Sequence, residues 1–586
     1  MNNAFGLFAT KNIRLCAIAL AAAIAVSMTG CPNDTTRTEG GTFVPVTDIT
    51  GVPTQATAGT PLTLTGTVVP SGATNRAIVW SVYDAGNTGA TIDGNTLNTA
   101  ATGTATVRAT IANGASATAD FTRNFDVTVD PAITLVPGNN LASRLEWLRN
   151  NAQDDSFYLV EITADEYIAP DQTALPTDRN NLVVVLRGRG EMRTVSLSAN
   201  GSLFTVGSGV TLILDENVTL VGRDDNDNPL LRISDDGILI MEDGSAVTGN
   251  TNTTTVIADR GGGVRVHEGG RFYMRGGRIF GNEIVGAGSG IGVHVIDNGT
   301  FTMDGGEISG NEASGGNANG GVLVHNTSTF TMEGGKITEN KGGGNTGGGV
   351  RVGPGSTFIM RDGKITGNET TGTAGGGGVG VFGTVASPAT FVMEGGEISG
   401  NETTEFWSGG GVIVNHESRF YMRGGRITGN TANGSGDAGG VRVRAISSDT
   451  STGVSIRGRA FFTMEGGEIF GNQATTGGVL LDGMSTFNMK GGEIFGNEAA
   501  SFGGGVAITQ GHSDAGGTLQ ISNGIIRGVD AEAGRENTTT RDDGAALLLS
   551  LGTAEHGTFN NAGEFAPLGT LDTTNYTIHV VNGELQ

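Results

Sequence analysis

The side chains best suited to acid–base chemistry lie in a segment that recurs along the chain. The segment FYMRGGRIFGNE, at 272–283, has seven further copies, at 301–312, 330–340, 358–369, 391–402, 420–430, 462–472 and 487–498. A charged residue follows the methionine of every copy: Arg275, Asp304, Glu333, Arg361, Glu394, Arg423, Glu465 and Lys490. A second charged residue precedes the isoleucine: Arg278, Glu307, Lys336, Lys364, Glu397, Arg426, Glu468 and Glu493.

The charges at these two positions alternate in sign from copy to copy. Six of the seven successive pairs are opposite at the first position, and five of the seven at the second. If the copies stack as layers about 4.8 Å apart, this alternation gives ladders of surface ion pairs, each worth at most about 1 kcal/mol. The carboxylates are therefore predicted to hold the layers in register, and no catalytic residue is assigned among them.

Other arrangements that could carry chemistry are sparse. The densest acidic run, Asp224-Asp225-Asn226-Asp227, could hold Ca²⁺, but a solvated turn is the preferred interpretation. Three of the seven histidines, His267, His325 and His416, each follow a short apolar strand and are interpreted as turn residues. No G-x-S-x-G, H-E-x-x-H or Walker pattern occurs. The sequence thus predicts no catalytic residue, no metal site and no cofactor.

The spacing of the apolar residues predicts the elements that position these charges. In F-x-M the two large side chains are two residues apart, so they share one face of a strand and the residue between them points outward. Layers of about 29 residues with three short strands each predict a right-handed parallel β-helix over 183–545, with last rungs and a C-terminal cap at 546–586. Val264 and Val266 are expected to face inward in the first strand, and Ile279 in the third.

Two columns of identical residues are expected inside the stack. The phenylalanine column is Phe272, Phe301, Phe330, Phe358, Phe391, Phe420, Phe462 and Phe487. The asparagine column is Asn250, Asn282, Asn311, Asn340, Asn368, Asn401, Asn430, Asn472 and Asn497. Identical asparagines at one turn position can hydrogen-bond along the stack. An internal ladder is therefore preferred to N-glycosylation at the NET sequons of 368–370 and 401–403.

The region before the repeats divides into four parts. Residues 1–31 have the basic start and apolar run of a signal peptide, and 32–43 form a flexible polar tether. Residues 44–130 contain short alternating strands between turn signals, the pattern of a β-sandwich, with Trp80 as the expected core aromatic. Residues 131–182 form a junction, in which Asn139 and Asn140 can cap an amphipathic helix at 141–152 that covers the first layer of the stack.

The run Met28-Thr29-Gly30-Cys31 resembles a bacterial lipobox. This resemblance implies cleavage before Cys31, a diacylglyceryl thioether on that residue and an acylated N-terminus. Several acyl chains together give stable membrane anchoring. The alternative is an ordinary secretory signal that contains a cysteine. Because Cys16 lies in the removed segment, the mature chain would hold one cysteine and no disulfide.

The positions that interrupt the repeat are the best candidates for ligand contact. Phe406 and Trp407 place two large aromatic residues in a turn where small polar residues are the rule. The other interruptions are an insertion at 444–459 and the turn at 382–389. Exposed aromatic side chains on a solenoid flank suit sugar or protein contact, whereas the structural alternative is that they fold down on a neighbouring loop.

The composition restricts the partners further. The chain has 586 residues, of which 101 are glycine and 13 are proline, without the G-X-Y period of collagen. Its formal charge of −24 argues against a nucleic-acid partner, because phosphate backbones are bound by clustered lysine and arginine. The expected partners are a membrane, through the lipid anchor, and a host protein or a glycan. We expect a monomer.

Several known families share parts of this pattern. Residues 44–130, with Trp80 and the strand GTATVRAT, resemble bacterial immunoglobulin-like domains of group 2, which most often serve as spacers. The GGGV entries and I-x-G-N endings resemble the repeats of chlamydial polymorphic outer-membrane proteins, except that Ile replaces Phe in several copies. The whole order of lipobox, immunoglobulin-like module, LEWL helix and Gly-rich repeats resembles surface lipoproteins of treponemes with pectin-lyase-like β-helix repeats.

These resemblances imply a protein of the cell envelope, lipid-anchored and facing the exterior from the outer membrane. The expected function is adhesion, interaction with a host or glycan, or an envelope structure, without enzymatic activity. The alternative is a β-helix that binds or cleaves a polysaccharide, since pectate lyases and polygalacturonases share this fold. Pectate lyases need clustered carboxylates that hold Ca²⁺, together with an arginine base, and polygalacturonases need a cluster of aspartates on one face. The repeats contain no cluster of either kind.

Overall fold

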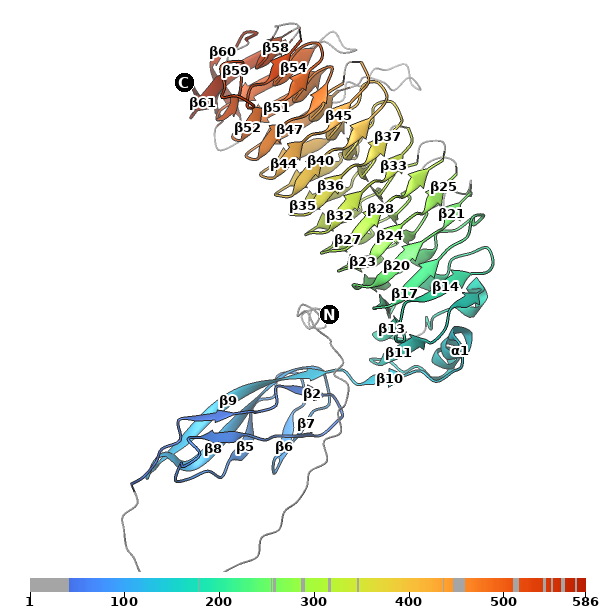
Figure 1. The fold of residues 1–586 in the computed structure, drawn as a ribbon, viewed down its shortest axis with the longest axis vertical. Coiled ribbons are helices and arrows are strands. Elements are labelled where there is room, and N and C mark those ends of the chain that lie inside the picture. The colour runs from blue at the N-terminus through green and yellow to red at the C-terminus, as the bar shows by residue number, and fades with distance from the viewer. Residues whose placement is uncertain are drawn as a thin grey trace, which may run out of the picture. The chain divides into compact units, whose positions relative to one another are not determined.

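A computed structural model describes residues 42–586, except 178, 255, 257–259, 286–289, 315–317, 345–346, 436, 446–458, 510–515, 541–543, 550–551, 560–563 and 575–576. The chain forms two compact units, which meet in sequence at Ile133 and Thr134. Both are built almost entirely of β-strands, as predicted (Figure 1).

The N-terminal unit consists of small, mainly antiparallel sheets around one core. Its strands are β1 (Asp48–Thr50), β2 (Gln55–Thr57), β3 (Leu62–Thr63), β4 (Thr67–Val69), β5 (Val79–Asp84), β6 (Thr91–Asp93), β7 (Thr96–Asn98), β8 (Gly103–Ser116) and β9 (Ala119–Asp130). They pair in the orders β1-β4, β2-β9-β8-β5 and β3-β7-β6. Trp80 is buried in this core, with its ring 6.2 Å from that of Phe125, which confirms the expected core aromatic.

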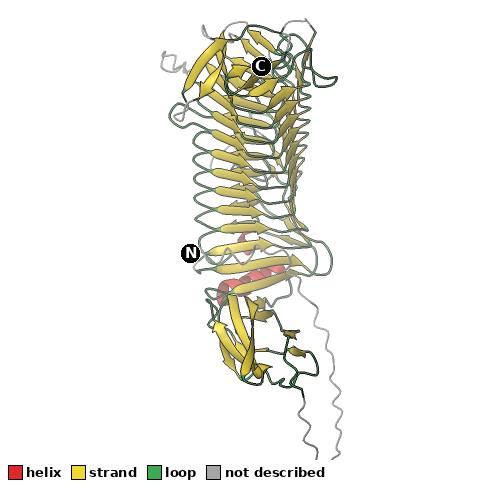
Figure 2. Ribbon diagram, turned by 90° about the vertical axis from the view of Figure 1, so that its left-hand side faces the viewer, coloured by secondary structure: helices red, strands yellow, loops and turns green. Residues whose placement is uncertain are grey.

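One helix, α1 (Leu141–Asn151), lies at the start of the second unit. A capping box fixes where the helix begins. The side chain of Asn140 accepts a hydrogen bond from the Ser143 N–H at 2.8 Å, and the Ser143 hydroxyl accepts one from the Asn140 N–H at 3.2 Å. Leu141, Leu145 and Leu148 are fully buried and join the core of the stacked strands. The helix therefore covers the first layer, as predicted (Figure 2).

The second unit is a parallel β-helix of about 12 turns, each close to 29 residues long. Its longest sheet runs in the order β10 (Ile133–Leu135), β11 (Phe157–Ile162), β13 (Leu182–Gly188), β16 (Val210–Leu214), β19 (Ile238–Met241), β23 (Arg271–Met274), β27 (Thr300–Met303), β31 (Thr329–Met332), β35 (Thr357–Met360), β39 (Thr390–Met393), β43 (Arg419–Met422), β47 (Ala460–Met464), β51 (Ser485–Met489), β55 (Gly517–Ile521), β59 (Gly552–Phe559) and β60 (Phe565–Thr570). We call it the Phe–Met sheet.

The second sheet carries the isoleucine of each repeat, and we call it the Ile sheet. Its order is β12 (Glu166–Ile168), β14 (Arg193–Leu197), β17 (Val218–Val221), β20 (Ser245–Thr248), β24 (Arg278–Phe280), β28 (Glu307–Ser309), β32 (Lys336–Thr338), β36 (Lys364–Thr366), β40 (Glu397–Ser399), β44 (Arg426–Thr428), β48 (Glu468–Phe470), β52 (Glu493–Phe495), β56 (Gly524–Ile526), β61 (Ile578–Val581) and β62 (Glu584–Leu585).

The third sheet carries the valines that follow the glycine runs, and we call it the Val sheet. Its order is β15 (Phe204–Val206), β18 (Leu231–Ile233), β22 (Val264–Val266), β26 (Val293–Val295), β30 (Val322–Val324), β34 (Val350–Val352), β38 (Val379–Phe382), β42 (Val412–Asn415), β46 (Val441–Arg444), β50 (Val479–Asp482), β54 (Val506–Thr509) and β58 (Leu547–Leu549).

The expectation of three strands per layer was wrong, because most layers contain a fourth. Ten strands, each only two residues long, form another parallel sheet: β21 (Thr251–Asn252), β25 (Glu283–Ile284), β29 (Glu312–Ala313), β33 (Lys341–Gly342), β37 (Glu369–Thr370), β41 (Glu402–Thr403), β45 (Thr431–Ala432), β49 (Gln473–Ala474), β53 (Glu498–Ala499) and β57 (Thr538–Thr539). Each follows directly on a stacked asparagine, which fixes the backbone so that the next two residues pair with the neighbouring layer.

The two predicted internal columns are present. Successive phenylalanine rings from Phe272 to Phe487 stack with centroids 4.5–4.9 Å apart and planes within 11° of parallel. From Asn311 to Asn497, each side-chain oxygen accepts from the backbone N–H and the amide of the preceding asparagine, as Asn401 does from Asn368 at 3.0 Å. The asparagines are at most 1% exposed, so the NET sequons lie in the core rather than at a glycosylated surface.

The stack begins earlier than residue 183 and ends by reversing direction. β11 and β12 lie within 131–182 and pair in parallel with β13 and β14, so the first layer starts at Phe157. At the other end, β60 pairs antiparallel with β59, and β61 pairs antiparallel with β56. Because β60 contains Pro567, its outer edge is a poor template for a further strand.

Candidate functional site

The charged columns form ladders of ion pairs along the outside of the β-helix. In the column after the methionines, Arg361 lies between Glu333 and Glu394, and Arg423 lies 3.3 Å from Glu394 and 3.3 Å from Glu465. In the column before the isoleucines, Arg278 contacts Glu307 at 3.0 Å, and Arg426 contacts Glu468 at 3.0 Å. The predicted ladders of surface ion pairs are therefore present; their role in holding the register stays a prediction.

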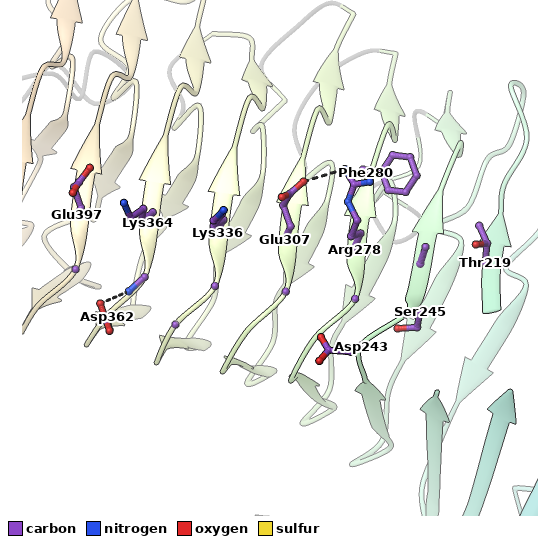
Figure 3. Close-up of a pocket in the computed structure, with 18 of the residues that line it drawn as sticks. Thr219, Asp243, Ser245, Arg278, Phe280, Glu307, Lys336, Asp362, Lys364 and Glu397 are labelled. Atoms are coloured by element: carbon purple, nitrogen blue, oxygen red, sulfur yellow. Dashed lines mark hydrogen bonds and ion pairs between the residues drawn. The ribbon is translucent and has the colours of Figure 1, made fainter. Parts of the chain in front are cut away.

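A groove of about 1010 Å³ runs across the layers beside the column that precedes the isoleucines (Figure 3). The glycine pairs of the repeats leave its floor without side chains, whereas Asp243 and Asp362 take a glycine position at two layers. Arg278, Glu307, Lys336, Lys364 and Glu397 lie in a row along one side, each from a successive strand of the Ile sheet. The groove was not predicted from the sequence, in which these side chains were assigned only to ladders of ion pairs.

The ionisation of Glu307 in the groove is controlled by its neighbours. A hydrogen bond from the Ser309 hydroxyl at 2.7 Å, together with the ion pair to Arg278, lowers the pKa of Glu307 and keeps this carboxylate ionised. Lys336 and Lys364 are adjacent and of like charge, and neither forms an ion pair within 4 Å with a residue that the structure describes. A general acid would instead need a carboxyl group whose pKa is raised toward neutrality.

The aromatic loop, which we define as 404–408, carries Phe406 and Trp407 between β41 and β42. The side chains are 49% and 39% exposed, respectively. Trp407 adopts a left-handed backbone conformation with φ of +62°, which a bulky residue adopts only under constraint. The guanidinium carbon of Arg444 lies 5.0 Å from the centre of the Trp407 ring. Trp407 therefore both packs on a neighbouring layer and presents part of its ring to solvent.

A buried network of four charged residues lies beside this loop. Asp437 accepts a hydrogen bond from the Ser408 N–H at 2.7 Å and lies 3.5 Å from Arg442. Arg442 also pairs with Asp482, whose carboxylate is 3.8 Å from Arg444. All four residues are at most 5% exposed. The network connects the aromatic loop to the two following layers and holds Trp407 in place through Ser408 and Arg444.

Burial perturbs the ionisation of this network. Removal from water raises the pKa of Asp437 to about 6, even though Ser408 and Arg442 stabilise the carboxylate. Burial also lowers the pKa of Arg444 to about 10. Because the pKa of Asp437 is higher in the folded state than the usual 3.8, its contribution to stability is fully present below about pH 4 and is lost as the pH rises through about 6.

The network was not predicted from the sequence, because only the two valines of the V-x-V strand were assigned and not the residue between them. In the Val sheet the outward face is covered by the loops that precede each strand, so Arg265, His294 and Arg442 are buried. The apolar residues Leu323, Ile413 and Leu480 occur at the same position and could have indicated the cover.

The histidines predicted to be turn residues do follow the strands of the Val sheet. Burial lowers the pKa of His267, His325 and His416, so these side chains are uncharged near neutral pH. The acidic run at 224–227 also has structural roles: Asn226 joins the asparagine ladder through Asn250 at 2.9 Å, and Asp225 pairs with Arg223 at 2.6 Å.

Of the remaining predicted positions, some fall outside the described residues and others lie in turns that the structure describes. Cys31 and most of the insertion at 444–459 fall outside the described residues. In the turn at 382–389, Val385 is exposed and Ala389 is fully buried. Within the described part of the chain, no group of three or more His, Cys, Asp or Glu side chains is arranged to hold a metal ion.

Known proteins assign neither a family nor a function to this chain. None of the helices in the described ranges has both the length and the apolar character needed to span a membrane. No family model matches the chain, and no curated protein is significantly similar to it.

Proposed function

We propose that this chain is a lipid-anchored protein of the bacterial cell envelope, displayed outward, in which an immunoglobulin-like spacer carries a β-helix that binds a host molecule or a glycan. The observation that carries the binding role is the aromatic loop. Phe406 and Trp407 are exposed but are held on a constrained backbone by Asp437 and Arg444. Rigid aromatic side chains of this kind supply a large share of binding energy at interfaces.

Removing the two aromatic rings is expected to weaken binding. In the double variant Phe406→Ala and Trp407→Ala, affinity for the ligand found on a glycan array or on cultured host cells should fall at least tenfold, or about 1.4 kcal/mol. The matched control is Tyr167→Ala, which removes an 83% exposed aromatic side chain elsewhere on the β-helix unit and should leave binding unchanged. Unaltered affinity in the double variant would exclude the aromatic loop as the contact site.

Lipid attachment can be tested separately at Cys31. The variant Cys31→Ser should move from the detergent phase to the aqueous phase in a Triton X-114 partition, because each acyl CH₂ group contributes about 0.8 kcal/mol to membrane binding. Cys16→Ser, inside the predicted signal peptide, should still partition with detergent. Retention of Cys31→Ser in the detergent phase would refute the anchor. Proteolysis of intact cells then reports whether the protein faces the exterior.

A second candidate function is cleavage of a polysaccharide, which one observation favours. The groove brings acidic and basic side chains, including Glu307, Lys336 and Lys364, along a path that an extended chain could follow. Release of reducing ends or unsaturated uronates from polygalacturonate by the full chain would distinguish cleavage from binding.

A further inference from the structure

The outer face of the Phe–Met sheet carries an uncharged strip over four consecutive layers. Its members are the two outward residues of β27, β31, β35 and β39: Thr300, Thr302, Thr329, Thr331, Thr357, Ile359, Thr390 and Val392. The layers pair in register, so Thr300, Thr329, Thr357 and Thr390 form one column and the other four form a second. All eight side chains are at least partly exposed.

The ends of the strip are marked by the same residue types. Before it, β23 presents Arg271 and Tyr273 outward, and after it β43 presents Arg419 and Tyr421 at the same two positions. Arg271 contacts Asp236 at 3.1 Å, and the Arg419 guanidinium lies 5.9 Å from the Phe461 ring. The two tyrosines are five layers apart, roughly 24 Å at about 4.8 Å per layer.

Uncharged residues also face outward in β19 and β47, so the strip is distinguished by its threonines and by the tyrosine at each end rather than by neutrality alone. Preference of strands for β-branched residues accounts for Thr, Ile and Val, but arginine occupies the first column at both ends. The column that follows each methionine, next to the strip, is charged in all eight repeats. A neutral area bearing six threonine hydroxyls therefore lies on a molecule with a net charge of −24.

The chemistry of the strip selects one kind of partner. Each threonine offers one hydroxyl donor, two acceptor lone pairs and a methyl group, repeated at the layer spacing. Lipid would require larger apolar side chains, and nucleic acid would require cations. Threonine and valine are under-represented among the residues that dominate protein–protein binding. A chain of neutral sugar rings presents hydroxyls at its edges and C–H groups on its faces, and an amphipathic tyrosine ring at each end can stack on it.

We propose that the strip from Tyr273 to Tyr421 binds a neutral polysaccharide that lies along the axis of the β-helix. This inference rests on the proposed binding function and specifies its ligand class and a second contact surface. It predicts a preference for uncharged glycans and an affinity that increases with oligosaccharide length until the chain spans the roughly 24 Å between the tyrosines.

The test uses the full chain and a glycan array that holds neutral and anionic oligosaccharides of graded length. The strip variant is Thr302→Glu with Thr331→Glu, two outward residues of paired strands. The matched control is Thr338→Glu with Thr366→Glu, two outward threonines of paired strands in the Ile sheet. The strip variant should bind neutral oligosaccharides at least tenfold more weakly, and the control should bind as the unaltered chain does. Tyr421→Ala should weaken binding, whereas Tyr421→Phe, which keeps the ring, should not.

Each outcome decides between the two proposals. Loss of neutral-glycan binding in the strip variant but not in the control supports the inference. Binding that survives in the strip variant but is lost with Phe406→Ala and Trp407→Ala overturns the inference and leaves the aromatic loop as the site. Binding only to anionic glycans, or only to a host protein, also overturns it while the proposed function stands. Absence of any ligand on host cells or glycans would contradict both the proposed binding function and this inference.

Discussion

Replacement of Phe391 by alanine is expected to destabilise the β-helix by about 3–5 kcal/mol. The Phe391 ring is fully buried and stacks between Phe358 and Phe420, at centroid distances of 4.8 and 4.7 Å. Its removal loses the burial of one aromatic ring and also two stacking contacts. Since neighbouring layers pair through the backbone on both sides, the cavity cannot collapse fully. The midpoint of guanidinium unfolding, followed by circular dichroism, measures this effect.

The control for this variant is the next residue. Val392→Ala shortens an outward side chain of the same strand and should change stability by no more than about 0.5 kcal/mol. Phe391→Leu, which refills much of the cavity, should fall between the two. Equal unfolding midpoints for Phe391→Ala and Val392→Ala would show that the stacked column does not hold the layers together.

Removal of a side chain from the asparagine ladder is expected to cost about 3 kcal/mol or more. The side-chain oxygen of Asn401 accepts two hydrogen bonds from Asn368, and its amide donates to Ile365 O at 2.9 Å and to Asn430 Oδ1 at 2.9 Å. In Asn401→Ala, the donors of Asn368 and the carbonyl of Ile365 lose these partners inside the core. Each buried group left unsatisfied costs about 1–3 kcal/mol.

Asn401→Asp separates the loss of hydrogen bonds from the loss of volume. The carboxylate still accepts from Asn368, but it places an oxygen and a negative charge against Asn430 Oδ1 and Ile365 O. A buried, unpaired carboxyl group has a raised pKa, so the stability of this variant should fall as the pH rises. The exposed Asn433, which donates to Glu402 at 2.6 Å, provides the control Asn433→Ala. An Asn401 variant as stable as Asn433→Ala would contradict the structural role of the ladder.

The repeat itself carried enough information to predict most of the β-helix. Two-residue spacing assigned Phe272 and Met274 to the core, and both are fully buried. Recurrence of asparagine at one turn position predicted the ladder, and alternation of charge predicted pairs such as Arg423 with Glu465. These predictions succeeded because a parallel stack places equivalent residues of successive repeats next to one another. Residues that lie one repeat apart in the sequence are therefore in contact in the fold.

The candidate sites were less accessible to such reasoning. Phe406 and Trp407 were identified because they interrupt the repeat, but the constraint on this loop depends on contacts with Asp437 and Arg444 of the following layer. The groove at Lys336 and Lys364 is lined by residues at repeated positions, but its presence was not predicted from them. The contacts that constrain Trp407 have no fixed spacing along the chain.

The amino-acid sequence by itself determined which side chains face the core, because the strand pleat alternates them. It also determined which residues stack on the equivalent residues of the next repeat, because the repeat length sets the layer. Only the tertiary structure decided which outward faces reach solvent. Loops bury the outward face of the Val sheet and force its charges, such as Arg442 and Asp482, to pair. In β27, β31, β35 and β39 the outward residues of the Phe–Met sheet are at least partly exposed, so the threonines beside Phe301 and Phe330 remain available to a partner.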